Sequence, residues 1–144
     1  MLPIALVVAA MSLTVCAGDS YAKTKSHGPK GEVQATTYDY EIAMPVKLTP
    51  GVHIIVFTNA GTVDHEIVIF KTDRTDLHMP LAAAGGDIDE ESPLLTKVAD
   101  SGDPLKPGHH ETFKTDDLAP GHYVAVCNLT GHYMKGMSLN IIVQ

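Results

Sequence analysis

Three side chains that can bind a metal ion stand at equal spacing near the C-terminal end of the chain. Cys127, His132 and Met137 follow one another at intervals of five residues, at the end of a run that reads as a strand. A thiolate, an imidazole and a thioether held close together suit one soft metal ion, and copper best of all. We therefore expect a strand that ends at Cys127 and a loop that folds back to present His132 and Met137, with a fourth ligand from elsewhere in the chain.

Each of these residues has an ordinary explanation when it is considered alone. A cysteine in an apolar strand is often a small buried residue, a loop histidine is often a surface residue, and a methionine often fills a gap. The combination favours a metal site, because Gly131 and Gly136 stand directly before His132 and Met137 and permit a tight backbone path.

The sequence PGHYVAVCNLTGHYMKGM resembles the C-terminal copper loop of the cupredoxins, the small blue copper proteins, and its spacing is most similar to the auracyanin and rusticyanin versions. In this family the remaining ligand is a histidine that follows an asparagine near the end of an earlier strand, and NAGTVDHEIVIF nominates His65. The resemblance implies one type 1 copper ion in a plane of His65, Cys127 and His132, with Met137 as a weak axial ligand. It also implies backbone N–H donors near the sulfur, with that of Glu66 as a candidate. Asparagine is common in the family where Glu66 stands, so the role of this side chain is left open.

The N-terminal residues have the composition of a secretory signal peptide. Residues 2–17 carry no charge and are followed by Ser20 and Ala22, which fit a small-x-small cleavage site. We expect cleavage after Ala22 and export to the periplasm, although the first residues lack the usual lysine or arginine and a retained membrane anchor is the alternative. Cleavage would remove Cys16 and leave Cys127 as the only cysteine. An exported protein with one thiol either pairs with another chain or keeps the sulfur for chemistry.

The mature chain is predicted to be acidic. Removal of Asp19 leaves 16 of the 17 acidic side chains against 10 basic ones, and hence a net charge of −6. This balance argues against nucleic acid and anionic membranes as partners. Residues 23–32 have the composition of a flexible tail, and residues 33–144 suit one domain. We expect a monomer without a membrane span after cleavage.

Short strand-like runs and turns alternate from residue 33 onward, with no long helical period. Residues 71–108 do not fit this pattern, because prolines and glycines recur throughout, and they predict a long irregular insertion. Tyr123, two residues after Pro120-Gly121, resembles the tyrosine corner of Greek-key sandwiches. We predict an all-β, Greek-key, two-sheet β-sandwich, with residues 34–44 as an edge strand and 52–59 as a central strand. Further strands are expected at 46–48, 65–70, 109–115 and 137–143, together with the ligand strand that ends at Cys127.

The resemblance implies an electron carrier that cycles one copper ion between Cu(II) and Cu(I). A redox partner, such as a c-type cytochrome or a copper oxidoreductase, would dock over the loop around His132, Tyr133 and Met134, and the acidic residues within 87–91 would steer it. Two alternatives stay open. One is a copper carrier or storage protein, and the other is a catalytic pair of Cys127 and His132.

Related copper enzymes are excluded by specific residues. A mixed-valence binuclear centre needs two bridging cysteines, and the mature chain has one. Multicopper oxidases join their sites through His-Cys-His, whereas Val126 and Asn128 flank Cys127. Copper nitrite reductases need a second cupredoxin domain and a second copper site. We therefore expect that this chain alone is not an enzyme.

Overall fold

The computed structural model describes residues 31–83 and 85–144, so the predicted signal peptide, residues 1–22, and residues 23–30 of the predicted tail lie outside the described residues. Among the described residues, none of the helical segments has the length and apolar character that a membrane crossing requires. The regular elements of these residues are β1 (Glu32–Tyr38), β2 (Glu41–Ala43), β3 (Lys47–Leu48), β4 (Ile54–Asn59), β5 (Val68–Lys71), β6 (Thr96–Asp100), β7 (His110–Lys114), β8 (Gly121–Val126), the short 3-10 helix η1 (Tyr133–Lys135) and β9 (Ser138–Val143).

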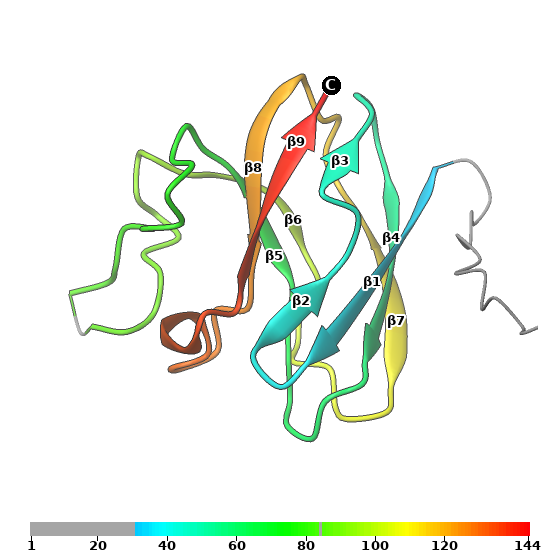
Figure 1. The fold of residues 1–144 in the computed structure, drawn as a ribbon, viewed down its shortest axis with the longest axis vertical. Coiled ribbons are helices and arrows are strands. Elements are labelled where there is room, and N and C mark those ends of the chain that lie inside the picture. Colours follow the sequence, from blue (N-terminus) through cyan, green and yellow to red (C-terminus); the bar gives the residue numbers. More distant parts are fainter. Residues whose placement is uncertain (1–30, 84) are drawn as a thin grey trace, which may run out of the picture.

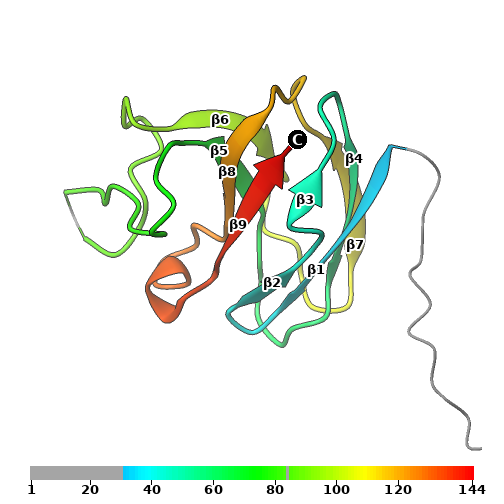
Figure 2. The same ribbon diagram turned by 45° about the horizontal axis from the view of Figure 1, so that its top comes forward.

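The strands form two sheets that face each other (Figures 1 and 2). One sheet has the order β2-β1-β4-β7, and the other has the order β3-β9-β8-β5-β6. The pairs β1/β4 and β3/β9 are parallel, whereas the other pairs are antiparallel. This arrangement confirms the predicted all-β, two-sheet β-sandwich.

The core lies between the two sheets and follows the alternation of each strand. In β4, Ile55 and Phe57 are fully buried, and Tyr123 and Ala125 of β8 face them from the other sheet together with Cys127. These last three residues share one face, as their spacing of two predicts. The Tyr123 hydroxyl donates a hydrogen bond of 2.7 Å to the carbonyl oxygen of Ala119. The predicted tyrosine corner is therefore present.

The outer face of the five-stranded sheet has a second apolar cluster. Residues of β5 and β8 supply one side, and residues of the predicted insertion cover them: Val68, Phe70, Val124 and Val126 under Met79, Ile88 and Leu95. The prediction of 71–108 as irregular throughout was wrong in one place, because β6 pairs with β5 there. Only Ala99 of β6 is buried, so this strand leaves no alternating apolar pattern in the sequence.

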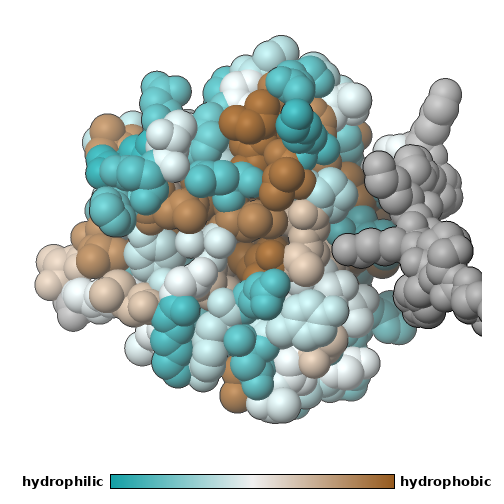
Figure 3. Space-filling view, in the orientation of Figure 1, coloured by the Kyte–Doolittle hydropathy of each residue, from teal (hydrophilic) through white to brown (hydrophobic). Residues whose placement is uncertain are grey.

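The predicted edge strand at 34–44 is two strands joined at Asp39 and Tyr40. β1 is not an edge strand, because it lies between β2 and β4, and β2 forms the edge. The opposite sheet has a different edge. Apolar side chains gather in the middle of the face in Figure 3, where β3 and β9 lie, because the two-residue β3 leaves Val46 and Ile142 partly exposed.

Candidate metal centre

His65 and Cys127 are brought together by neighbouring strands of one sheet. Cys127 directly follows β8, and His65 stands just before β5, which pairs with β8 so that Val68 lies opposite Val126. The backbone of His65 is fixed on its other side by Leu105, through N–H to O hydrogen bonds of 3.1 Å and 2.7 Å in the two directions. Two of the predicted ligands are therefore part of the sheet framework.

The structure brings three predicted ligands to one point. The donor atoms of His65, Cys127 and His132 all lie within 4.8 Å of one another. The Cys127 Sγ atom is 3.3 Å from Nδ1 of His132 and 4.0 Å from Nδ1 of His65. His65 and Cys127 are fully buried, while His132 is half-buried. Two imidazoles and one thiol that converge in this way fit a trigonal copper site.

Met137 closes the loop that carries His132. Its side chain is fully buried in the same core cluster as Cys127. Its carbonyl oxygen accepts a hydrogen bond of 3.2 Å from the N–H of Cys127, and its own N–H donates one of 3.3 Å to the carbonyl oxygen of His132. These bonds tie the two ends of the loop together. The axial role of the thioether remains a prediction.

The loop needs both of the glycines that precede its ligands. Gly131 has φ of 77° and Gly136 has φ of 92°, values in the left-handed region that favours glycine. Gly136 ends η1, and its N–H donates to the carbonyl oxygen of Tyr133 at 2.8 Å. The tight backbone path expected from the sequence is thus present.

Residues of the insertion hold the loop from outside, a feature that the sequence did not reveal. Asn128 accepts a hydrogen bond of 2.6 Å from the N–H of Ile88 through Oδ1. Its Nδ2 donates to the carbonyl oxygen of Ile88 at 3.2 Å and to Oε1 of Glu90 at 2.8 Å. One side chain directly after the cysteine ligand therefore fastens the start of the loop to the insertion.

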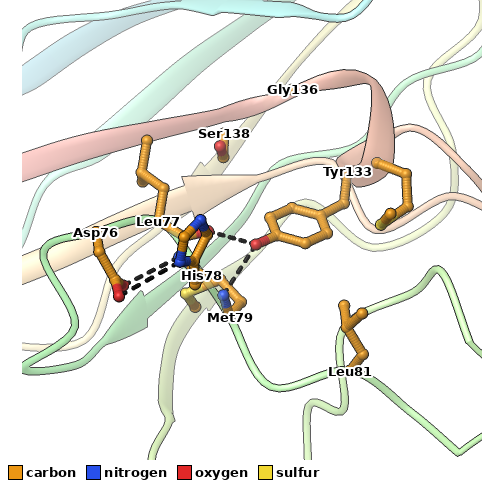
Figure 4. Close-up of a pocket in the computed structure, with 9 residues that line it drawn as sticks. Asp76, Leu77, His78, Met79, Leu81, Tyr133, Gly136 and Ser138 are labelled. Atoms are coloured by element: carbon orange, nitrogen blue, oxygen red, sulfur yellow. Dashed lines mark hydrogen bonds and ion pairs between the residues drawn. The ribbon is translucent and has the colours of Figure 1, made fainter.

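Further along the loop, Gly131 and Tyr133 also contact the insertion. Asp87 accepts a hydrogen bond of 3.2 Å from the N–H of Gly131. The Tyr133 hydroxyl donates to the carbonyl oxygen of Leu77 and accepts a 2.9 Å hydrogen bond from the N–H of Met79 (Figure 4). Because these partners are distant in sequence, no local pattern predicts them.

Glu66 contacts the sulfur and also the start of the loop. Its N–H lies 3.5 Å from Cys127 Sγ, as a weak hydrogen-bond donor, and its Oε1 accepts a 3.0 Å hydrogen bond from the N–H of Asn128. The backbone donor expected from the family resemblance is therefore present. Burial raises the pKa of the Glu66 carboxyl above its usual value.

The electrostatics of the metal-free site argue against a nucleophilic role for Cys127. Burial raises the pKa of the Cys127 thiol, although the N–H groups of Glu66 and Leu129 act in the opposite direction. Burial and the nearby His65 lower the pKa of His132, which keeps this imidazole neutral and able to donate to a metal. Reactive cysteines are partly exposed and have lowered pKa values, whereas a bound metal ion itself removes the thiol proton.

Two residues beside the site were missed by sequence reasoning. Asp39 Oδ1 lies 3.3 Å from Nε2 of His65, and the ring of Tyr40 meets the ring of His132 edge-on, with 5.2 Å between centroids. The side chain and backbone of Thr62 donate hydrogen bonds to the Asp39 carboxylate and lower its pKa to about 2. A turn between two strands carries no sequence signal for contacts with residues so far along the chain.

A sequence profile described as the Sulfocyanin (SoxE) domain matches residues 33–144. No curated protein matches the chain with significant similarity. Among solved structures, dithionite-reduced auracyanin from Roseiflexus castenholzii is 25% identical with a TM-score of 0.58, and the match covers 81% of this chain and 99% of that one.

Two more distant structures have the same fold. Auracyanin A from Chloroflexus aurantiacus, described as a "blue" copper protein, is 18% identical with a TM-score of 0.54 and covers 79% of this chain and 100% of its own. Rusticyanin from Thiobacillus ferrooxidans is 21% identical with a TM-score of 0.54, over 81% of this chain and 79% of that one.

Proposed function

Because the chain belongs to the sulfocyanin (SoxE) domain family of cupredoxins, we propose that it is a periplasmic blue copper protein that transfers single electrons between protein partners. The observation that carries this proposal is the convergence of His65, Cys127 and His132, whose donor atoms lie within 4.8 Å of one another. Met137, which is buried in the same cluster as Cys127, would complete the ligand set. One type 1 copper ion bound there supplies a Cu(II)/Cu(I) couple and a thiolate charge-transfer band.

In this function the protein keeps its ligands rigid and shields them from water. His65 and Cys127 are fully buried and fixed by the sheet, so water does not compete for their positions. The loop with His132 is tied at its ends and along its outer side. A rigid set of ligands keeps the structural change between the two redox states small, which favours fast electron transfer. The same rigidity disfavours ready exchange of the metal.

His132 is the route by which electrons leave in this proposal, because it is the half-buried member of the three. Beside it, Met134 is 60% exposed on η1. An apolar hollow of about 560 Å³ opens next to this helix, and its lining includes Leu77, Leu81, Tyr133 and Met134. Figure 4 shows Leu77 and Leu81 on either side of the ring of Tyr133. A redox partner that docks over this face would exclude water between donor and acceptor.

We assign the steering of a basic partner, such as a c-type cytochrome or a copper oxidoreductase, to the acidic residues within 87–91. Asp87 and Glu90 accept hydrogen bonds from the copper loop, and Glu90 also accepts one of 3.1 Å from Lys97. Removal of either carboxylate would therefore disturb the copper loop as well as the surface charge. Asp89 accepts a 3.2 Å hydrogen bond from the N–H of Glu91 rather than from the loop, so neutralising Asp89 and Glu91 tests the steering role with the loop contacts intact.

Export to the periplasm is supported by the signal-like residues 2–17 and by the fate of the cysteines, since cleavage after Ala22 leaves Cys127 alone. Cell fractionation with N-terminal sequencing of the mature protein checks this assignment. A mature protein that still carries residues 1–22 at a membrane would replace it with the retained anchor.

The absorption spectrum of the copper-loaded full chain tests the function. We expect an intense visible band in the wild type and its complete loss in Cys127→Ser, because the band arises from the thiolate. Thr130→Ser serves as a control that leaves the ligands intact. A wild type that binds Cu(I) tightly but gives no visible band with Cu(II) would favour a copper carrier, and retention of the band in Cys127→Ser would contradict the site.

A further inference from the structure

The β1–β2 turn contacts the ring of each histidine ligand. Asp39 reaches Nε2 of His65, the ring nitrogen opposite the one that faces Cys127, at 3.3 Å, and Tyr40 stands edge-on to His132. Resting on the proposed function, we propose that Asp39 is a positioning residue that orients His65 and uses its negative charge to stabilise Cu(II) relative to Cu(I), while Tyr40 supports His132.

The geometry of Asp39 is that of a carboxylate that selects one form of an imidazole. An acceptor at Nε2 keeps the ring proton there and leaves Nδ1 of His65 free for a metal, as second-shell carboxylates do in other metal sites. Asp39 is itself held by Thr62, whose N–H donates a 2.7 Å hydrogen bond to Oδ1 and whose hydroxyl donates one of 2.5 Å to Oδ2. The carboxylate is thus fixed before any metal binds.

Gly61 gives an independent sign that the chain leaves room for this contact. A Cβ atom at this position would lie 2.8 Å from Nε2 of His65 and even closer to Oδ1 of Asp39. Real Cβ atoms do not approach other atoms so closely, and both neighbours are anchored. A glycine is therefore required for Asp39 and His65 to meet.

The backbone conformation of Tyr40 supports the proposal that this residue positions His132. Its φ of 68° lies in the left-handed region, which bulky residues rarely occupy because the conformation is strained. The ring is placed between His132 and Lys135, whose Nζ lies 3.8 Å from the ring centroid. Contacts with the copper loop explain why an aromatic residue stands where glycine or asparagine would suit the backbone.

Voltammetry of the copper-loaded full chain tests the role of Asp39. Asp39→Asn keeps an oxygen that can accept from His65 but removes the charge, so Cu(II) loses stabilisation and the reduction potential rises. We expect a roughly tenfold fall in the ratio of Cu(II) to Cu(I) affinity, which is about 59 mV for one electron. Glu41→Gln is the matched control, since it removes the same charge from an exposed site on the same hairpin and should change the potential far less.

A second measurement separates a specific role from a structural brace. In wild-type protein, both metal-free and with Cu(I), NMR should show a slowly exchanging Nε2 proton on His65. Asp39→Ala and Gly61→Ala should both lose this signal, and Asp39→Asn should restore it in part, while the visible band persists in all of them. Both Asp39→Ala and Gly61→Ala should also raise the reduction potential.

The outcomes distinguish this inference from the function on which it rests. An unchanged potential in Asp39→Asn with an intact visible band would overturn the inference and leave the blue copper assignment standing. A shift in Glu41→Gln as large as that in Asp39→Asn would also overturn it, because the effect would then be general electrostatics. If the wild type had no visible band, the function would fail, and loss of the Nε2 proton in metal-free Asp39→Ala would still establish the link between Asp39 and His65.

Discussion

The two halves of the copper site are built in different ways. His65 and Cys127 flank the neighbouring strands β5 and β8, are fully buried, and are held by backbone hydrogen bonds of the sandwich. His132 and Met137 belong to a loop with one short 3-10 helix, and His132 faces partly outward. The sheet half takes its backbone support from the sandwich, with one further side-chain contact from Asp39 to His65, whereas the loop half depends throughout on segments that lie around it.

This difference shows how the protein fixes its ligands and still leaves one of them accessible to a redox partner. A redox site needs fixed ligands, but it also needs one ligand near the surface for its partner. The loop half resolves this conflict because the insertion holds it through Asn128 and Tyr133, and the β1–β2 turn supports His132 through Tyr40. A sandwich alone would provide the first requirement and not the second.

The largest expected effect in the loop half comes from Asn128→Ala. The change leaves the buried N–H of Ile88 without its partner, so we expect a loss of about 1–3 kcal/mol in the free energy of unfolding. Copper release to a chelator should accelerate at least several-fold, because the start of the loop is no longer fastened. Chemical denaturation and the decay of the visible band measure the two quantities.

Asn140→Ala is the matched control for this comparison. The Asn140 side chain also makes hydrogen bonds, with His122 and the carbonyl oxygen of Thr75, but it lies on β9 and not in the loop. It should reduce stability without accelerating copper release. Equal release rates in the two variants would show that the loop half is no less firmly held than the sheet half.

Substitution of Met137 should change the balance between the redox states more than the stability of the fold. A thioether interacts weakly with Cu(II), so Met137→Gln offers a harder oxygen, stabilises Cu(II) and lowers the potential. Met137→Leu withdraws the donor and raises it. Each tenfold change in relative affinity corresponds to about 59 mV, or about 1.4 kcal/mol. Equal potentials in both variants and the wild type, measured by voltammetry, would remove Met137 from the ligand set.

The smallest expected effect concerns the outer side of the loop half. Neutralising Asp89 and Glu91 together should slow association with a basic cytochrome several-fold at low ionic strength and hardly at all at physiological salt. Stopped-flow kinetics at several salt concentrations measures this. The control pair, Asp116→Asn with Asp117→Asn, removes the same charge near the start of β8, away from the copper end of that strand. A salt dependence that is equal for both pairs would contradict specific steering.

The sheet half could be predicted from the sequence to a large extent. Alternation and turn residues located most strands, and the cysteine loop with its glycines indicated the ligands, because these are local patterns. β6 was not predicted, because Ala99 is the only buried residue of this strand and no apolar alternation marks it. The division of 34–44 into two strands was not predicted, because the turn at Asp39 and Tyr40 contains no glycine or proline to mark it in the sequence.

The supports of the loop half could not be predicted. Nothing in the sequence distinguishes Asn128 and Asp87 from other polar residues, because their contacts exist only once the insertion packs against the copper loop. The acidic residues within 87–91 were therefore interpreted only as a solvated patch that steers a partner. Asp39 shows the same limit, since its contact with His65 joins residues of different sheets. Long-range hydrogen bonds are a property of the fold and leave no periodicity in the chain.

The parallel pairing of β3 with β9 joins the early part of the described domain to the last strand of the described residues. The copper loop lies between β8 and β9, and the N–H of Cys127 at its start donates to the carbonyl oxygen of Met137 at its end. Contacts between residues so far apart in sequence form slowly during folding, on the order of milliseconds to seconds. We therefore expect the ligand loop to become fixed only late in folding, once β9 has paired.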